Sequence, residues 1–94
     1  MRRYFVYIMS NKKRGTLYIG VTNSLKTRTW QHKSGMYDGF TKRYSLHDLI
    51  YFEEFTDVRD AITREKQLKK WNRGWKIELI EKMNPEWIDL YDTL

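Results

Sequence analysis

Two short runs of β-branched and aromatic residues lie near the start of the chain. Arg3–Met9 (RYFVYIM) and Thr16–Val21 (TLYIGV) each have the length and composition of a β-strand. Between them, Ser10–Gly15 (SNKKRG) has the residues typical of a turn. The pattern therefore predicts an antiparallel hairpin. Gly20 within the second strand is notable, because glycine weakens a strand and often marks the close approach of another segment or a ligand.

The rest of the chain alternates between helical and extended patterns. The expected elements are a helix from Asn23 or Ser24 through Lys33, ended by Gly35; a loop over Met36–Leu46; a strand over Asp48–Phe55; a helix from Val58 to about Trp71; and a helix over Trp75–Met83. Asn72–Gly74 separates the last two helices, and Asn84-Pro85 ends the second of them. A short terminal turn that packs Trp87 is expected over Glu86–Leu94.

The order ββαβαα predicts the fold class. It indicates an α+β domain with an open three-stranded antiparallel sheet and flanking helices. The 94 residues fit one domain, spanning 1–94. The chain has no cysteine, so a disulfide framework and a thiolate zinc site are both excluded. The first apolar stretch, Tyr4–Met9, is too short for a signal sequence or a membrane span, and we expect a cytoplasmic protein with no membrane partner.

Charge is unevenly distributed along the sequence. The formal net charge is +6, and residues 1–76 hold 17 Lys and Arg against 7 Asp and Glu, whereas residues 77–94 hold one Lys against five acids. A basic body favours a polyanionic partner such as nucleic acid. Many small soluble proteins are basic without binding one, so charge alone leaves that alternative open.

Glu65 is the most informative polar position. It falls near the centre of the apolar stripe of the helix that begins at Val58, a stripe formed by Val58, Ala61, Ile62 and Leu68. A carboxylate directed at a core needs a cation, hydrogen-bond donors or a bound divalent metal. The alternative is an ion pair with Arg28 or a solvated edge position.

Other groups suited to phosphate chemistry precede Glu65. Arg28 and His32 lie one turn apart on one helix face, and arginine suits phosphate through two charge-assisted hydrogen bonds. Tyr7 and Tyr18 could face one side of the hairpin, with room left by Gly20. Singly, each has a structural alternative: a salt bridge, a satisfied core histidine, or buried tyrosines. Together with the carboxylate they form a set suited to phosphoryl transfer.

At these residues the sequence resembles the GIY-YIG nuclease superfamily, and within it the small stand-alone bacterial proteins of UPF0213 type. Tyr18–Gly20 reads YIG, and Val6–Ile8 stands at the GIY element with valine in place of glycine. Ten residues separate the two tyrosines, which is the family spacing. Asn23–His32 and Ala61–Trp71 resemble the helices that carry the family's arginine, histidine and glutamate.

The resemblance implies a role for each of these side chains. Tyr7 would be the general base that activates water, assisted by Tyr18 and His32, and Arg28 would neutralise the scissile phosphate. Glu65 would hold a single Mg²⁺ or Mn²⁺. The implied reaction is hydrolysis to a 5′-phosphate and a 3′-hydroxyl.

Two further features complete the expected site. Asn84 matches a polar residue near the active site in some relatives. Seven residues are candidates for binding nucleic acid, with cations for phosphates and a ring for bases: Lys42, Arg43, Tyr44, Lys69, Lys70, Arg73 and Lys76. We expect Trp71 and Trp75 to fill the core beneath them.

Three functions remain open at the sequence level. The first is a metal-dependent endonuclease that hydrolyses phosphodiester bonds, with DNA rather than RNA as the expected substrate. The second is a non-catalytic nucleic-acid-binding module that retains the fold, and the third is a protein-interaction domain that uses the acidic final segment. Because the sequence carries no attached DNA-binding domain, we expect weak sequence selectivity, or recruitment by a protein partner.

Overall fold

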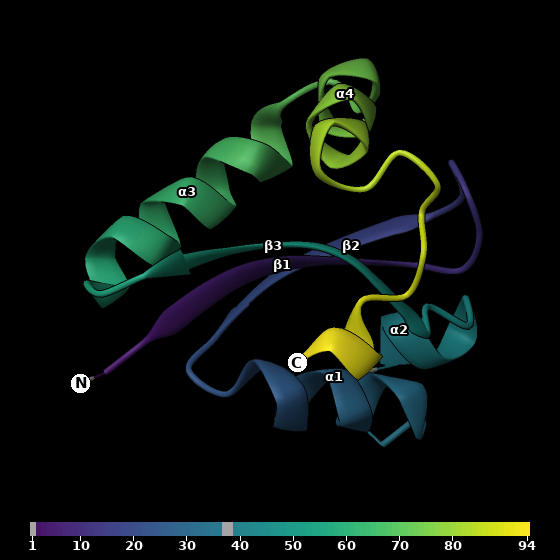
Figure 1. The fold of residues 1–94 in the computed structure, drawn as a ribbon, viewed down its shortest axis with the longest axis horizontal. Coiled ribbons are helices and arrows are strands. Elements are labelled where there is room, and N and C mark those ends of the chain that lie inside the picture. Colours follow the sequence, from purple (N-terminus) through teal and green to yellow (C-terminus); the bar gives the residue numbers. More distant parts are fainter. Residues whose placement is uncertain (1, 37–38) are drawn as a thin grey trace.

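The structure, a computed structural model, describes residues 2–36 and 39–94. Its elements, in chain order, are β1 (Tyr4–Ser10), β2 (Leu17–Thr22), α1 (Leu25–Lys33), α2 (Gly39–Arg43), β3 (Asp48–Phe55), α3 (Val58–Lys70), α4 (Arg73–Met83) and the 3₁₀ turn η1 (Tyr91–Thr93). They form the α+β fold that the sequence predicts, with a three-stranded antiparallel sheet and flanking helices (Figure 1).

β1 is the central strand, and the order across the sheet is β2-β1-β3. The predicted hairpin places Tyr7 of β1 opposite Gly20 of β2. On its other side β1 pairs antiparallel with β3, and a bulge interrupts the pairing between Ile8 and Met9. Because β2 is an edge strand, helices that cover the two faces of the sheet can both reach it.

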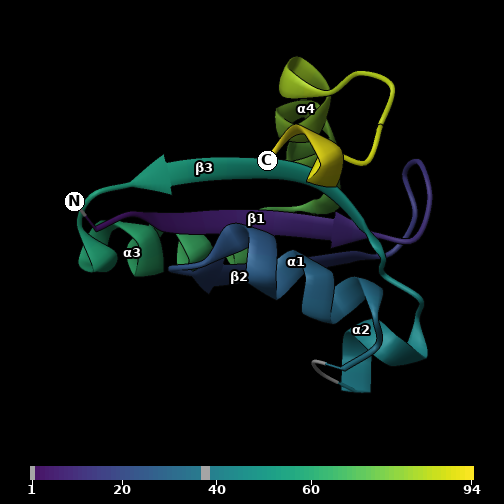
Figure 2. The same cartoon turned by 60° about the horizontal axis from the view of Figure 1, so that its bottom comes forward.

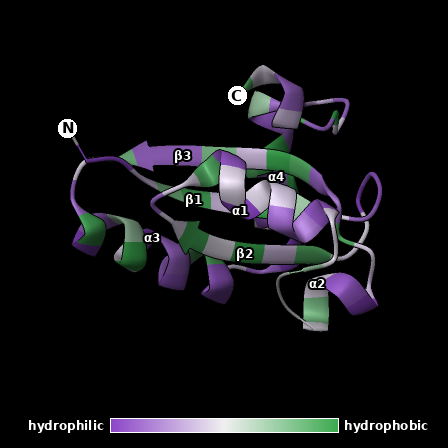
Figure 3. Cartoon of the chain, turned by 90° about the horizontal axis from the view of Figure 1, so that it is seen from below, coloured by the Kyte–Doolittle hydropathy of each residue, from purple (hydrophilic) through white to green (hydrophobic). Residues whose placement is uncertain are grey.

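Helices cover both faces of this sheet. Figures 1 and 2 show α3 and α4 on one face and α1, α2 and the C-terminal turn on the other. Successive side chains of a strand point to opposite faces, so Val6 and Ile8 pack under α3 and α4, whereas Tyr7 and Met9 pack with Leu25 of α1. Figure 3 shows that hydrophobic residues, in green, make up much of the strands, whereas α3 carries many hydrophilic residues, in purple.

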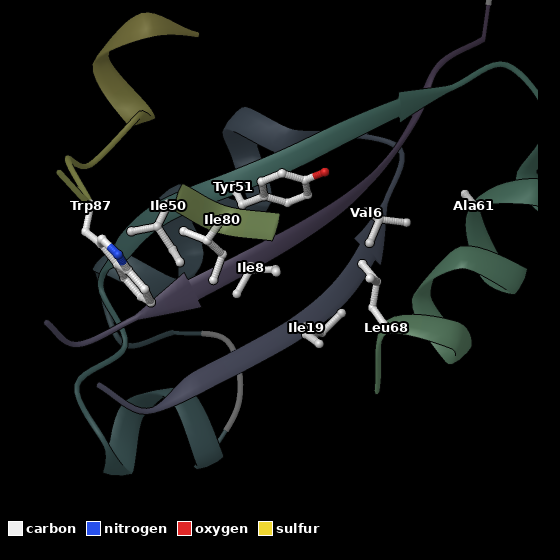
Figure 4. Packing of buried hydrophobic residues seen from close by; sticks show 9 residues of the cluster. All are labelled: Val6, Ile8, Ile19, Ile50, Tyr51, Ala61, Leu68, Ile80 and Trp87. Atoms are coloured by element: carbon white, nitrogen blue, oxygen red, sulfur yellow. The ribbon is translucent and has the colours of Figure 1, made fainter. Parts of the chain in front are cut away.

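Figure 4 shows the core between the sheet and the α3–α4 layer. It is formed by Val6, Ile8, Ile19, Ile50, Tyr51, Ala61, Leu68, Ile80 and Trp87. As predicted, the chain after α4 contributes Trp87, which is buried in this core. Its indole Nε1 donates to Glu81 over 2.7 Å, so the segment is fixed to α4 as well as to the sheet.

The chain then passes along β3, at the edge opposite β2. The side-chain amide of Asn84 donates to the carbonyls of Ile50 at 3.0 Å and Ile88 at 2.8 Å, and its oxygen accepts from Ile88 N at 3.0 Å. Leu90 N donates to Leu49 O at 2.7 Å. These bonds carry the chain from the α4 layer to the α1 layer.

Two expectations about boundaries were wrong. Part of the predicted loop forms the short helix α2 and buries Thr41, while residues 37 and 38 of that loop lie outside the described residues. Helix α4 begins at Arg73 rather than Trp75, because the side chain of Asn72 accepts from Trp75 N at 2.9 Å. Asn72 is thus an N-cap and not only a helix breaker. None of the helices in the described ranges combines the length and apolar character that a bilayer crossing requires.

Candidate active site at the edge of the sheet

A buried hydrogen-bond chain links β1, α1 and α2. The Tyr7 hydroxyl lies 2.9 Å from Nε2 of His32, and Nδ1 of His32 lies 3.0 Å from the Thr41 hydroxyl. All three side chains are buried, Tyr7 and His32 completely. When the Nδ1–H of His32 donates to Thr41, Nε2 is left to accept a hydrogen bond from Tyr7. The chain therefore fixes the His32 ring and offers an acceptor for the proton of Tyr7.

Gly20 explains how the Tyr7 ring fits against the edge strand. A Cβ atom at this position would lie 2.6 Å from the Tyr7 hydroxyl oxygen and 2.7 Å from its ring carbon Cζ. Both distances are well below normal van der Waals contact. Glycine is thus required because the phenol lies directly over the strand, which accounts for a residue that weakens the strand pattern.

Tyr18 lies on the same face, one step farther out. Its ring centroid is 5.3 Å from that of His32 and 6.2 Å from that of Tyr7. Unlike Tyr7, it is only partly buried. The two tyrosines that the sequence predicts to share a side therefore do so, but they differ in access: Tyr7 is inside and Tyr18 is at the surface.

Two pockets lie along β2 and connect the two layers of helices. One is lined by Leu17, Tyr18, Ile19, Phe40, Lys69 and Lys76. The other is lined by Tyr4, Val21, Thr22, Asn23, Arg28, Val58 and Ile62. Each pocket thus combines strand residues with side chains from α1 or α2 on one face and from α3 or α4 on the other. The edge strand is the place where groups from both faces meet.

Glu65 lies between these pockets along α3. Ile62, one turn before it, lines the pocket of Arg28, and Lys69, one turn after it, lines the pocket of Tyr18. The Glu65 side chain is 16% exposed, so most of it is shielded from solvent. The structure therefore gathers Tyr18, Arg28 and Glu65 along one strand edge, with Tyr7 and His32 behind Tyr18.

The expected environment of Glu65 needs two corrections. It borders the apolar stripe rather than occupying its centre: Ala61 and Leu68 are buried, whereas Val58 and Ile62 are 40% and 39% exposed. The reason is that Val58 and Ile62 line the open pocket beside β2 rather than the core beneath α3. The ion pair of Glu65 is also a different one from the Arg28 pairing considered above, since Lys69 Nζ lies 3.5 Å from its carboxylate.

The chemistry of the donor set determines which metal could bind. Among residues 2–36 and 39–94 no three His, Asp or Glu side chains cluster closely enough to enclose an ion. Glu65 offers a single shielded carboxylate, which Lys69 neutralises. Mg²⁺ commonly keeps several waters and binds through one or two carboxylates and the substrate's phosphates. The site therefore fits a hydrated divalent ion shared with substrate, and does not fit a closed protein cage.

Other predicted site residues lie outside this group. The amide of Asn84 is fully engaged beside β3, at the far edge of the sheet, so its role is structural. The Arg73 guanidinium donates to the carbonyls of Arg14 and Gly15 in the hairpin turn, the latter at 2.6 Å. These bonds anchor α4 to the turn.

The predicted binding residues of α2 are exposed. Lys42 and Arg43 are at the surface, and Tyr44 is 43% exposed with the Arg43 guanidinium 5.6 Å from its ring centroid. Lys70 is also exposed, and Lys76 lines the Tyr18 pocket.

The tryptophans behave differently from one another. Trp71 is partly buried and packs against the core, as expected. Trp75 is 55% exposed, so the expectation that it fills the core was wrong. It lies in the first turn of α4 and lines a surface recess with Trp71.

Sequence reasoning also missed contacts that complete the site. Thr41 and Phe40 lay in a segment predicted to be a loop, and the pattern gave no signal for either. The pairing of Glu65 with Lys69 had a visible signal, because the two are four residues apart on one helix.

Comparison with known proteins defines the class. The model of the GIY-YIG catalytic domain matches residues 3–78, so the chain belongs to the GIY-YIG family. Its similar relatives are UPF0213 proteins. One from Syntrophus aciditrophicus is 36% identical over 87 residues, covering 92% of this chain and 98% of the relative. Another, from Clostridium perfringens, is 38% identical over 76 residues, 81% of each chain.

A solved structure supports the fold. The solution NMR structure of the UPF0213 protein BH0048 from Bacillus halodurans aligns with a TM-score of 0.58 at 24% identity, covering 93% of this chain and 92% of that one. The resemblance seen in the sequence is thereby confirmed for the family and for the fold.

Proposed function

We propose that this protein is a metal-dependent endonuclease that hydrolyses phosphodiester bonds, in DNA rather than RNA, with weak sequence selectivity. Membership of a nuclease superfamily supports the reaction class. The observation that carries the proposal is the gathering of Tyr18, Arg28 and Glu65 along the β2 edge. A phenol, a guanidinium and a carboxylate are the groups that proton transfer, phosphate binding and metal binding require.

Arg28 and Glu65 would bind different charged groups, the phosphate and the metal ion. Arg28 is placed to bind the scissile phosphate through its planar fork of donors, which matches phosphate oxygens. Glu65 would hold the Mg²⁺ or Mn²⁺ ion, with Lys69 leaving the carboxylate. When bound, the ion would stabilise charge that develops on the phosphate oxygens.

Burial supports a division of roles between the tyrosines that differs from the one the resemblance implies. A general base must come within hydrogen-bond reach of the water it activates. Tyr7 is completely buried, whereas Tyr18 borders a pocket. We therefore assign contact with water to Tyr18, and assign to Tyr7 and His32 the positioning of the Tyr18 ring, whose centroid lies 6.2 Å and 5.3 Å from theirs.

Surface cations would hold the nucleic-acid backbone. Lys42, Arg43 and Lys70 are exposed and Lys76 lines the Tyr18 pocket, whereas Arg73 is excluded because it binds the hairpin turn. If about four cations contact phosphates, affinity falls with salt with a log–log slope of roughly −3 to −4. A binding constant independent of salt would rule out this surface. Contacts with a backbone do not depend on base sequence, so sequence specificity would come from a protein partner.

A non-catalytic nucleic-acid-binding module is the second candidate. The observation that favours it is Lys69, whose ammonium already neutralises Glu65. In such a module the pair would stay closed and no ion would bind.

A substrate panel distinguishes the two functions. Labelled duplex, flap and single-stranded DNA and labelled RNA are each incubated with the protein in Mg²⁺ or Mn²⁺. The proteins compared are wild type, Glu65→Ala and, as a control, Glu54→Ala, which removes an exposed carboxylate from β3. We expect wild type and Glu54→Ala to cut DNA to 5′-phosphate ends, and Glu65→Ala to bind it uncut. Binding without cleavage by wild type under every condition would favour the module instead.

A further inference from the structure

Trp75 forms part of a surface recess that the proposed cleavage site does not use. The recess encloses about 230 Å³ and is lined by Trp71, Trp75, Glu78, Leu79 and Lys82. Pockets for drug-sized ligands typically enclose roughly 300–1,000 Å³, so this one suits a single ring system rather than a whole ligand. Trp75 is 55% exposed, which is a large apolar surface to leave in water.

The recess is rigid. Asn72 caps α4 and accepts from Trp75 N at 2.9 Å, which fixes the Trp75 backbone. The Trp71 ring stands perpendicular to that of Trp75, at 90° with the centroids 5.9 Å apart. Trp71 itself packs on the core, and the Arg64 guanidinium lies 5.2 Å from its centroid. Trp71 is therefore fixed by the core and by Arg64, and it supports the Trp75 ring from the side. A recess that is already formed loses little conformational entropy when a flat ligand binds.

Arg64 is in turn held by a carboxylate. Glu53 accepts two hydrogen bonds from Arg64, both at 2.9 Å. Burial opposes ionisation of Glu53, but the hydrogen bonds from Arg64 and Tyr51 outweigh it and hold the pKa of Glu53 below its ordinary value. The carboxylate therefore stays charged at neutral pH and keeps the guanidinium against Trp71.

The charge around the recess indicates the ligand. Residues 64–76 contain six cations and one acid, Glu65. Arg64, Lys69 and Arg73 are engaged with Glu53, Glu65 and the hairpin turn. The cations that remain to face an anionic ligand are Lys66 and Lys70, both exposed, and Lys76, which is partly buried. Lys76 follows Trp75 directly and lines the Tyr18 pocket. An anionic strand bound at the cleavage site would therefore run beside the exposed indole. Glu78 and Lys82 add one acceptor and one set of donors, which match the polar edge of a nucleobase.

We propose that Trp75 stacks against one unpaired nucleobase of the bound nucleic acid, next to the site of cleavage. The substrate class rests on the proposed function and narrows it to single-stranded or frayed segments. Bases inside a duplex already stack on their neighbours, so an indole on the protein surface can bind only a base that is unpaired. A protein partner for the same indole would need an acidic surface to match the cations, whereas nucleic acid supplies both phosphates and flat rings.

Binding without cleavage tests the proposal. Fluorescence anisotropy measures the affinity of wild type, Trp75→Ala, Trp75→Phe and Trp30→Ala for a single-stranded oligonucleotide and for a blunt duplex, without divalent ions. Trp30 on α1 is 48% exposed and serves as the matched control. We expect Trp75→Ala to weaken single-strand binding about 5- to 150-fold, Trp75→Phe to weaken it less, and Trp30→Ala to leave it unchanged. Duplex affinity should change less than twofold.

Two results would overturn the stacking role. One is single-strand binding by Trp75→Ala equal to that of wild type, and the other is an equal loss for single strand and duplex. Thermal unfolding of each variant confirms that the loss does not come from misfolding. Because the assay contains no divalent ion, an inactive nuclease leaves it unaffected. Stacking without cleavage would then contradict the proposed hydrolysis and not this inference.

Discussion

Because Tyr7 is buried and Tyr18 borders a pocket, we expect removal of the Tyr18 hydroxyl to lower mainly the cleavage rate and removal of the Tyr7 hydroxyl to lower mainly the stability. Tyr18→Phe removes the phenol that borders the pocket and leaves the buried chain intact. Loss of a general base typically slows a reaction about 10²- to 10⁴-fold. Because Tyr18 is only partly buried, we expect the free energy of unfolding of the Tyr18→Phe variant to differ from that of wild type by less than about 0.5 kcal/mol.

Tyr7→Phe should act mainly on stability. The change takes the hydroxyl from Nε2 of His32, 2.9 Å away, inside a fully buried cluster. A buried polar group left unsatisfied costs about 1–3 kcal/mol, and we expect that loss in the free energy of unfolding. Tyr7 acts on the reaction through its neighbours, so the rate should fall by about tenfold, equivalent to one hydrogen bond of about 1.4 kcal/mol.

Two assays separate these effects. Single-turnover cleavage measures the chemical step without product release, and urea unfolding followed by tryptophan fluorescence measures stability. The reasoning is refuted if Tyr7→Phe loses more than about 10²-fold in rate at wild-type stability while Tyr18→Phe cleaves within a few-fold of wild type. Tyr7 would then be the base, as the family resemblance implies.

Two further predictions concern the scaffold. Gly20→Ala would bring Cβ within 2.6 Å of the Tyr7 hydroxyl oxygen, so we expect the free energy of unfolding, measured by heat and by urea, to fall by about 1–3 kcal/mol. The control is Gly39→Ala, which should not destabilise the protein because no atom lies within 4 Å of its Cβ; equal effects of the two substitutions would contradict this. The hydrogen bond from Arg14 lowers the pKa of Glu81 from its ordinary 4.5 to about 2, so the stabilisation is complete above pH 4.5 and is lost as the pH falls towards 2. Glu81→Gln should show a smaller fall in unfolding free energy over that range, and an unchanged fall would refute the assignment.

Much of the fold could be read from short-range patterns. The hairpin, the third strand and the three longer helices are each encoded by local periodicity, caps and breakers, and the order of elements then determines the sheet. Helix α2 was not predicted because its five residues are too few to show a helical period. It forms in a segment that buries Thr41 against His32, a contact between residues nine apart that local pattern does not encode.

The site was predictable in its members but not in its arrangement. Periodicity placed Glu65 with Ala61 and Leu68, but it could not show that Val58 and Ile62 line a pocket beside β2 and are partly exposed. Likewise, strand alternation put both tyrosines on one face. Which of them is buried depends on α1 and α2 covering that face, and this is a tertiary property.

Tertiary context also decided the cations and the tryptophans. Arg73 appeared as one member of a basic segment, but it binds turn carbonyls more than fifty residues away. Trp75 looked like a core residue, yet it is 55% exposed, because which side of α4 packs on the sheet is a tertiary property.

The proposed function requires that Glu65 bind a divalent ion at the β2 edge, between Arg28 and Tyr18. Paramagnetic broadening by Mn²⁺ in an NMR spectrum, with an uncleavable oligonucleotide bound, measures where the ion binds. We expect Mn²⁺ to broaden the signals of Glu65, Arg28 and Tyr18 before those of Asn84 beside β3, and we expect Glu65→Gln to abolish this order. Broadening centred elsewhere, or broadening that Glu65→Gln leaves unchanged, would show that Glu65 does not hold the ion.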